Sequence, residues 1–293
     1  MEFAVLSDIH GNYVALETCV KHAFEKGIQN FIFLGDYLGE LAYPQKTMQF
    51  LYSLRETYRC RFIKGNKENY WLNYNPLWKE RDSTTGALYY TYHNLTQKEL
   101  DFFSQLADKA ELSLQMLPTI TLCHGSPNKV NEDLRPDDEG TFSIMEKNRA
   151  NYILCGHTHL QYEIRYNKKV LLNPGSVGMP LCSGGKAQFM ILRSTAELSW
   201  ESEMLSIDYD VEKVIDDLHT SGLYEKAPSW CIISEKVLRT GENSHGAVLD
   251  RAMSLCRKKT GQCQWPDIPE AYWQMAMDEI YTGGNGDDEA KTL

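Results

Sequence analysis

Five short segments rich in strand-forming residues each end next to a residue that can bind a metal ion. The segments cover residues 3–6, 31–34, 61–64, 119–123 and 152–155. Their length and composition are typical of buried β-strands. In open α/β sheets, ligands bind in the crevice outside the carboxyl ends of the strands. Side chains placed directly after these segments are therefore expected to meet at one edge of the fold.

The residues after these segments form an ordered series of oxygen and nitrogen donors. In chain order they are Asp8-x-His10, Gly35-Asp36, Gly65-Asn66, His124-Gly125 and Gly156-His157-x-His159. No cysteine is among them, so they suit a pair of hard-to-borderline divalent ions, and paired ions suit phosphate ester chemistry. Each motif alone is weak, since a Gly-Asp pair is also an ordinary turn. Five motifs at five strand ends are hard to explain by coincidence, which favours a metal site.

The series resembles the pattern of the calcineurin-like metallophosphoesterases, and the resemblance covers about residues 1–205. Residues 173–178, which read Asn-Pro-Gly-Ser-Val-Gly, are further similar to the small bacterial and archaeal branch of that family, as are residues 8–12 and 35–39. That branch includes phosphodiesterases and dinucleoside polyphosphate hydrolases. The resemblance implies an α/β fold, a four-layer α/β/β/α sandwich of two mixed sheets with the metals at one end.

The resemblance also implies how the ligands divide between two metal ions. One ion would be held by Asp8, His10, Asp36 and His159, and the other by Asp36, Asn66, His124 and His157. Asp36 would bridge the ions and hold them roughly 3.5–4 Å apart. In the family mechanism a bridging hydroxide attacks phosphorus, and the catalytic residues implied here are Asp36, Asn66, His124 and Lys67. Manganese is the first expectation for the ions, with iron, zinc, nickel or cobalt as alternatives.

Lys67 departs from the commonest family pattern, in which a histidine follows the asparagine. A lysine with an ordinary pKa of roughly 10.4 is a poor proton donor near neutral pH. It is a good point charge for a phosphate oxygen or a leaving oxyanion. We therefore expect Lys67 to stabilise charge; the alternative is a solvated lysine paired with Glu68.

Composition and charge narrow the possible partners. The net charge of −10 argues against broad nucleic-acid binding through a basic surface. No stretch of eighteen apolar residues is present, so no transmembrane helix and no membrane partner are expected. The start of the chain lacks the features of a signal peptide, and the eight cysteines then predict reduced thiols in the cytoplasm. Cys123 and Cys155 are expected to be small buried hydrophobic residues.

Hydrophobic periodicity predicts helices that alternate with the strands. The expected helices cover residues 12–26, 44–58, 96–108 and 139–149, and Thr96 with Glu99 forms a capping-box pattern. Short strands joined by turns are expected at residues 162–166, 170–172, 188–192 and 197–205. Helix-linked strands followed by hairpins suggest two facing mixed sheets flanked by helices.

The composition changes after the proposed catalytic domain of residues 1–205. Apolar residues recur at helical spacing over 206–281, which predicts a helical appendage of three to five amphipathic helices. Residues 282–293, rich in Gly and Asp, are expected to form a flexible tail. The appendage could cover the mouth of the site, make a dimer contact, or simply pack on the sheet. The sequence carries no signal for the oligomeric state.

Residues 70–92 are unusually aromatic and directly follow the Gly65-Asn66 motif. A loop of this kind could stack a nucleobase near the metals, and the alternative is packing against the appendage. The histidines outside the motifs, His22, His93, His219 and His245, are expected to be ordinary structural or surface residues.

The predicted function is that of a dimetal phosphoesterase acting on a small phosphorylated metabolite or a dinucleotide. Serine/threonine protein phosphatase, cyclic phosphodiesterase and nuclease are the alternatives within this class. A non-catalytic scaffold on the same fold is the alternative outside it. All the ligand positions of the pattern are filled, which favours an enzyme.

Overall fold

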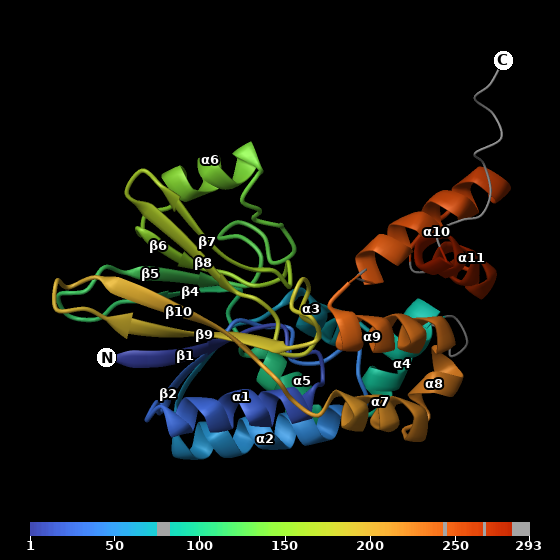
Figure 1. The fold of residues 1–293 in the computed structure, drawn as a ribbon, viewed down its shortest axis with the longest axis horizontal. Helices are drawn as coiled ribbons and strands as arrows, with labels where there is room; N and C mark the ends of the chain where they lie inside the picture. The colour runs from blue at the N-terminus through green and yellow to red at the C-terminus, as the bar shows by residue number, and fades with distance from the viewer. Residues whose placement is uncertain (75–82, 243–244, 266–267, 283–293) are drawn as a thin grey trace.

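The computed structural model describes residues 1–74, 83–242, 245–265 and 268–282, and two five-stranded sheets form its centre (Figure 1). The first sheet has the order β10-β9-β1-β2-β3. Strands β1, β2 and β3 are parallel, whereas β9 runs antiparallel to both β1 and β10. The bounds are β1 (Glu2–Leu6), β2 (Asn30–Phe33), β3 (Arg59–Phe62), β9 (Ala187–Ser194) and β10 (Trp200–Ile207).

The second sheet has the order β4-β5-β6-β8-β7. Strands β5, β6 and β8 are parallel, and the edge strands β4 and β7 are antiparallel to their neighbours. The prediction of two mixed sheets is confirmed; β4 was not predicted. The bounds are β4 (Lys109–Leu112), β5 (Ile120–Cys123), β6 (Tyr152–Leu154), β7 (Gln161–Tyr166) and β8 (Lys169–Pro174).

The side chains of β1 show how the layers are stacked. Phe3 and Val5 point into the core between the two sheets, whereas Ala4 and Leu6 pack against helices on the outer face. Because both faces are covered, the strand is apolar at every position after Glu2. Helices α1 (Tyr13–Glu25), α2 (Pro44–Thr57) and α5 (Gln97–Ser104) cover the first sheet, and α6 (Glu139–Lys147) covers the second. The predicted four-layer α/β/β/α sandwich is confirmed.

The predicted helix starts have identifiable caps. The Oδ1 atom of Asn12 accepts a hydrogen bond of 3.0 Å from the amide of Ala15 at the start of α1. The capping box of α5 is present, since the amide of Thr96 donates to Glu99 Oε2 at 2.9 Å. Helix α5 ends at Ser104 rather than at residue 108, because the chain must become extended to enter β4 at Lys109.

The aromatic segment 70–92 is not a loop where the structure describes it. Helix α3 (Asn66–Leu72) starts at the proposed ligand itself, and α4 (Ser83–His93) follows; the intervening Trp78 lies outside the described residues. Tyr90 on α4 is buried in the core of the helical appendage. For Tyr90, packing against the appendage is therefore the observed arrangement.

The chain after β10 forms helices that pack together beside the ends of the sheets (Figure 1). Their core surrounds the fully buried Trp273 and the buried Trp230, whose ring centroids lie 5.7 Å apart. The helices are α7 (Val211–Thr220), α8 (Leu223–Lys226), α9 (Pro228–Thr240), α10 (His245–Thr260) and α11 (Glu270–Thr282). The division at residues 205 and 206 remains a proposal. The expected flexible tail, beyond Thr282 at the end of α11, lies outside the described residues.

None of the described helices is long and apolar enough to cross a membrane.

Candidate metal centre

The proposed ligands stand on sharp turns at the carboxyl ends of strands. Five of them have a left-handed backbone: φ is 54° at Asp8, 52° at His10, 52° at Asp36, 67° at His157 and 57° at His159. Non-glycine residues rarely adopt this region, and each such position costs on the order of 1 kcal/mol or more. The folded structure therefore holds these five side chains in directions that a relaxed turn would not give them.

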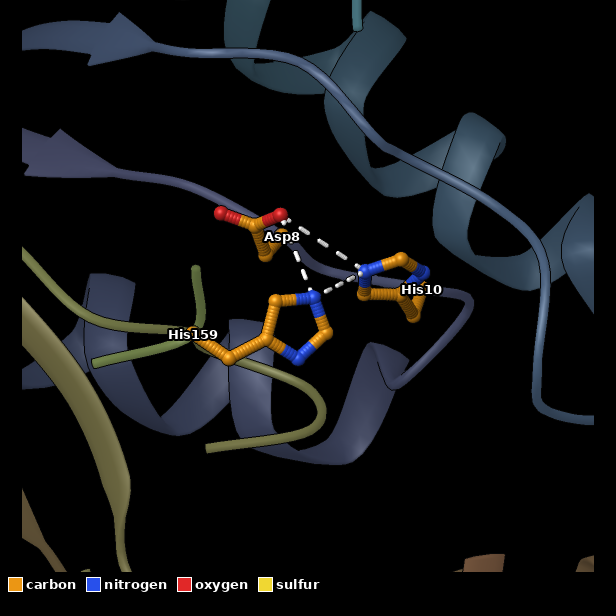
Figure 2. A group of neighbouring side chains, drawn as sticks. All are labelled: Asp8, His10 and His159. Carbon is orange, nitrogen blue, oxygen red and sulfur yellow. Dashed lines mark hydrogen bonds and ion pairs between the residues drawn. The ribbon is translucent and has the colours of Figure 1, made fainter. Parts of the chain in front are cut away.

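The carboxylate of Asp8 faces the imidazoles of His10 and His159 (Figure 2). Its Oδ1 atom is 3.3 Å from His159 Nε2, 3.7 Å from His10 Nε2 and 3.8 Å from His124 Nε2. The side chain is buried, yet this oxygen has no hydrogen-bond partner among the described residues. Buried carboxylate oxygens are normally bonded, so an unpartnered oxygen facing three imidazole nitrogens is what a cation site requires.

Asp36 extends the cluster towards the second sheet. Its Oδ1 atom is 3.4 Å from His124 Nε2, and its Oδ2 atom is 3.8 Å from His10 Nε2. Asn66 contributes its Oδ1 atom, which lies 3.1 Å from His124 Nε2. The two oxygens of Asp36 thus face the two halves of the cluster, as the bridging position implied by the family resemblance requires.

His157 lies beside this cluster but is turned away from its centre. Its Nε2 atom is 3.3 Å from Asp133 Oδ1, and its ring centroid is 5.2 Å from that of His124. Its backbone amide donates to Asp8 Oδ2 at 3.0 Å, so the main chain of His157 helps to hold Asp8. The structure therefore brings together six of the seven predicted ligands, and the role of His157 as a ligand stays a proposal.

Backbone carbonyls fix which nitrogen of His124 and of His159 faces the site. Leu34 O lies 2.7 Å from His124 Nδ1, and Met179 O lies 2.7 Å from His159 Nδ1. In each ring the Nδ1 atom therefore carries the hydrogen, which leaves Nε2 free to bind a cation.

Glycines at two of the turns allow the strand ends to approach closely. A Cβ atom on Gly65 would lie 2.1 Å from Asp36 Oδ1, and one on Gly156 would lie 2.6 Å from Asp8 Oδ2. Neither distance is possible between real atoms. Any side chain at these positions would displace one of the two carboxylates.

Glu68 is a positioning residue that the sequence alone did not reveal. Its buried carboxylate accepts hydrogen bonds from the amides of Asp36 at 3.0 Å, Tyr37 at 2.9 Å and Gly65 at 2.7 Å. Burial, together with the charge of Asp36, raises the pKa of Glu68 to about 7. The carboxylate ties the turn after β2 to the start of α3, and thereby sets the spacing between Asp36 and Asn66.

The carboxylates make the site attractive to positive charge. Burial alone would lower the pKa of His10, but Glu40 and Asp8 raise it to about 10. Asp36 and Asp8 likewise raise the pKa of His124 to about 9 against the effect of burial. Burial alone would raise the pKa of Asp8, but His124 and the other imidazoles hold it well below its usual range.

The residues present fit divalent cations. Among the described residues there are two groups, Asp8 with His10 and His159, and Asp8 with Asp36 and His124, and within each group the ligand atoms lie within 4.8 Å of one another. Their carboxylate oxygens and imidazole nitrogens are the donors that borderline divalent ions bind in proteins. The unpartnered Oδ1 atom of Asp8 belongs to both groups.

Comparisons with known proteins agree with this geometry. A family model for the calcineurin-like phosphoesterase superfamily domain matches residues 1–197. The chain belongs to the calcineurin-like phosphoesterase superfamily. As a member of that superfamily, it is a metal-dependent phosphoester hydrolase.

Relatives of this phosphoesterase are known from archaea and bacteria. The uncharacterized protein MJ0912 of Methanocaldococcus jannaschii is 25% identical over 244 residues, which are 78% of this chain and 94% of that protein. The crystal structure of the hypothetical protein PH1004 from Pyrococcus horikoshii matches with a TM-score of 0.70 and 20% identity, over 83% of this chain and 99% of the other. A metallophosphoesterase from Sphaerobacter thermophilus gives a TM-score of 0.67 and 19% identity, over the same 83% and 99%.

Lys67 of this phosphoesterase is neither free in solvent nor paired with Glu68. Its ammonium group makes a short ion pair with the buried carboxylate of Glu40, which also contacts His10 Nδ1. Glu40 thus joins a proposed metal ligand to Lys67, and no sequence pattern had singled it out. The Nζ atom also lies 5.9 Å from the ring centroid of Tyr70 and 5.8 Å from that of Trp230.

A cavity of about 340 Å³ opens above the metal centre. Its lining contains five of the proposed ligands, His10, Asp36, Asn66, His157 and His159, together with Asp133 and Arg135. Other lining residues come from α4 and the helical appendage, namely Ala87, Leu88, Trp230, Val237, His245, Leu249 and Trp265. The helical appendage therefore contributes residues to the cavity lining, and a role in covering the mouth of the site stays a prediction.

Proposed function

We propose that this phosphoesterase hydrolyses a phosphate ester or phosphoanhydride of a small phosphorylated metabolite or nucleotide at a two-metal centre. The buried Oδ1 atom of Asp8 carries the proposal, because it faces three imidazole nitrogens and has no hydrogen-bond partner in the described part of the chain. Divalent cations at such a centre neutralise phosphate charge and lower the pKa of water. Manganese is the proposed metal, because oxygen and imidazole ligands accept it readily.

Each proposed ligand has a definite part in this function. Asp8, His10, Asp36 and His159 would hold one cation, and Asp36, Asn66, His124 and His157 would hold the other. Asp36 would bridge them, which its two oxygens support by facing His124 and His10 separately.

Lys67 is proposed to stabilise negative charge rather than to donate a proton. Burial would lower its pKa, but Glu40 raises it above the ordinary lysine range, so the ammonium group stays charged. Its ion pair with Glu40 holds it at the cavity wall beside the proposed ligands.

The cytoplasm is the proposed location. All eight cysteines are free thiols in the structure, which supports a reducing compartment.

An activity assay with a ligand variant tests the proposed function. The protein, stripped of metal and reloaded with Mn²⁺, is offered an aryl phosphomonoester, an aryl phosphodiester, diadenosine tetraphosphate and a phosphopeptide. Metal-dependent turnover of a small ester or of the dinucleotide is expected. Unequal cleavage of the dinucleotide would identify an asymmetric hydrolase. Turnover of the phosphopeptide alone would replace the proposal with a protein phosphatase.

The variant Asp36→Asn should lose both metals together and lower kcat/KM by at least about 100-fold, because losing a ligand should cost more than the 10- to 100-fold typical of outer contacts. Metal content by mass spectrometry is the second readout. Full metal content in this variant would contradict the ligand assignment. Two bound metals in the parent protein, with no turnover of any substrate, would instead support a scaffold.

A further inference from the structure

Two chemically different sets of residues line the cavity above the metal centre, and they are called here its polar half and its apolar half. One half is polar and contains the proposed ligands together with Lys67 and Arg135. The other half is apolar, and its residues come from segments far apart in the sequence: Leu88, Leu181, Val237, Leu249 and Trp265. A ligand that fills the whole cavity must therefore carry an anionic group at one end and an apolar group at the other.

Lys67 lies at the boundary between these halves. Its ammonium group is paired with Glu40 on one side and lies near the ring faces of Tyr70 and Trp230 on the other. The ring of Tyr70 is in turn 5.6 Å from that of Trp265, which is 36% exposed. The aromatic surface thus runs continuously from the cation outward to the apolar wall.

The one titratable side chain that α10 adds to the cavity lining is a neutral imidazole. His245 stacks on Trp230 with ring centroids 4.2 Å apart, and its Nε2 atom lies 3.0 Å from Ser234 Oγ and 3.2 Å from Trp230 O. Burial lowers its pKa to about 4, so it carries no charge at neutral pH. Among the residues that the structure describes, the appendage therefore offers this part of the cavity no charge to bind a second ionic group.

We propose that the apolar half of the cavity selects the organic group of the substrate. The ester bound here, on the basis of the proposed function, joins a phosphate to one compact apolar or aromatic group. A volume of about 340 Å³ lies in the range of small-molecule sites. Leu249 and Trp265 are specificity-determining residues in this proposal, because both line the apolar half and neither belongs to the proposed metal ligands.

Two phosphate esters whose leaving alcohols have similar acidity test this inference. Benzyl phosphate should be hydrolysed with a kcat/KM roughly tenfold above that of glycerol 1-phosphate, because burying the ring removes apolar surface from water. Benzylphosphonate should likewise bind the Mn²⁺-loaded protein roughly tenfold more tightly than methylphosphonate by titration calorimetry. The binding measurement does not depend on turnover.

Two variants test whether the apolar half of the cavity produces the preference for benzyl phosphate. Leu249→Gln places a polar group of similar size there, and Trp265→Ala removes an aromatic face that is already partly exposed, so at least one of them should fold. Each should lower the benzyl-to-glycerol ratio of kcat/KM about threefold or more, because the benzyl ring loses more apolar contact than glycerol does. Asp250→Asn, on the exposed side of the same helix, is the matched control and should change neither substrate.

The outcomes separate the two proposals. Equal kcat/KM values for the two esters, or an unchanged ratio in both wall variants, would overturn the inference and leave the proposed function intact. Phosphopeptide turnover at the rate of benzyl phosphate would also overturn it. If neither phosphonate binds and no ester is hydrolysed, both proposals fail together.

Discussion

Asp8 is held in place by one neighbour in sequence and by one residue far along the chain. Asp8 is oriented by Ser7 Oγ, 2.6 Å from its Oδ2 atom, and by the amide of His157. The left-handed backbone of Asp8 and His10 costs free energy that the surrounding hydrogen bonds must offset. Local strain at these residues is therefore a sign of a site that is built before any ligand arrives.

Metal binding should release protons from the imidazoles. The pKa is about 10 for His10 and about 9 for His124, so both imidazoles are in the protonated, positively charged form at pH 7.5 in the metal-free protein. Binding a cation needs the neutral ring, so up to two protons should leave, and affinity should rise with pH until about pH 10. Titration calorimetry in buffers of different ionisation enthalpy measures this release.

The control for proton release is His93→Gln, since this exposed histidine on α4 should have no part in it. A binding enthalpy that is independent of the buffer would contradict the expected loss of protons.

At the scale of elements, helix α3 is attached to the site through its first turn. Asn66 is its first residue, the amide of Lys67 donates to Asp36 Oδ1 at 2.8 Å, and Glu68 accepts from three amides. A short helix such as this has little stability of its own. Its position thus depends on the Glu68 carboxylate and on the buried Trp71.

Replacing Glu68 should disturb both stability and metal binding. Glu68→Gln puts an amide donor where backbone donors already point, and we expect the free energy of unfolding to fall by about 2 kcal/mol. Metal affinity should fall roughly tenfold or more, because the spacing of Asp36 and Asn66 changes. Urea denaturation and metal titration measure the two effects.

Glu56→Gln on the exposed side of α2 is the matched control for this substitution. The two variants are compared by their loss in free energy of unfolding. If the losses for Glu68→Gln and Glu56→Gln agree within about 0.5 kcal/mol, the Glu68 carboxylate has no positioning role.

At the scale of the whole molecule, the helical appendage shares its core with the sandwich. Leu41 and Met179, which follow β2 and β8, are buried among the residues of α7 to α11. Tyr13 at the start of α1 donates a hydrogen bond of 2.8 Å to Asp217 on α7. An apolar interface of this kind couples the stability of the two parts.

The chain should consequently unfold in one transition. Leu218→Ala creates a cavity in the appendage core, where Leu218 is fully buried, and should cost about 2–4 kcal/mol. Scanning calorimetry should show a single peak that shifts to lower temperature, with bound metal released at the same midpoint. Lys259→Ala, at an exposed position of α10, should leave the peak unchanged. Two separated peaks, with metal retained through the first, would show independent domains.

Much of the fold and of the candidate metal centre could be predicted from local patterns in the sequence. The strands that precede Asp8, Asp36 and His124 could be recognised because apolar β-rich runs and the polar residues after them are neighbours in the chain. The capping box of Thr96 and Glu99 could be recognised for the same reason, since its two residues are close in sequence. Helix α9 also has local signals at its ends, Pro228 at its start and Gly241 with φ of 70° after its last residue.

The sequence by itself determined which side chains can bind metal and in which order the strands present them, because each motif is read within a few residues. Only the tertiary structure decided that Glu40 joins His10 to Lys67, that Glu68 holds the turn of Asp36, and that α9 and α10 wall the cavity. These contacts join residues up to hundreds of positions apart. Burial and close packing, which bring such residues together, leave no short-range pattern in the chain.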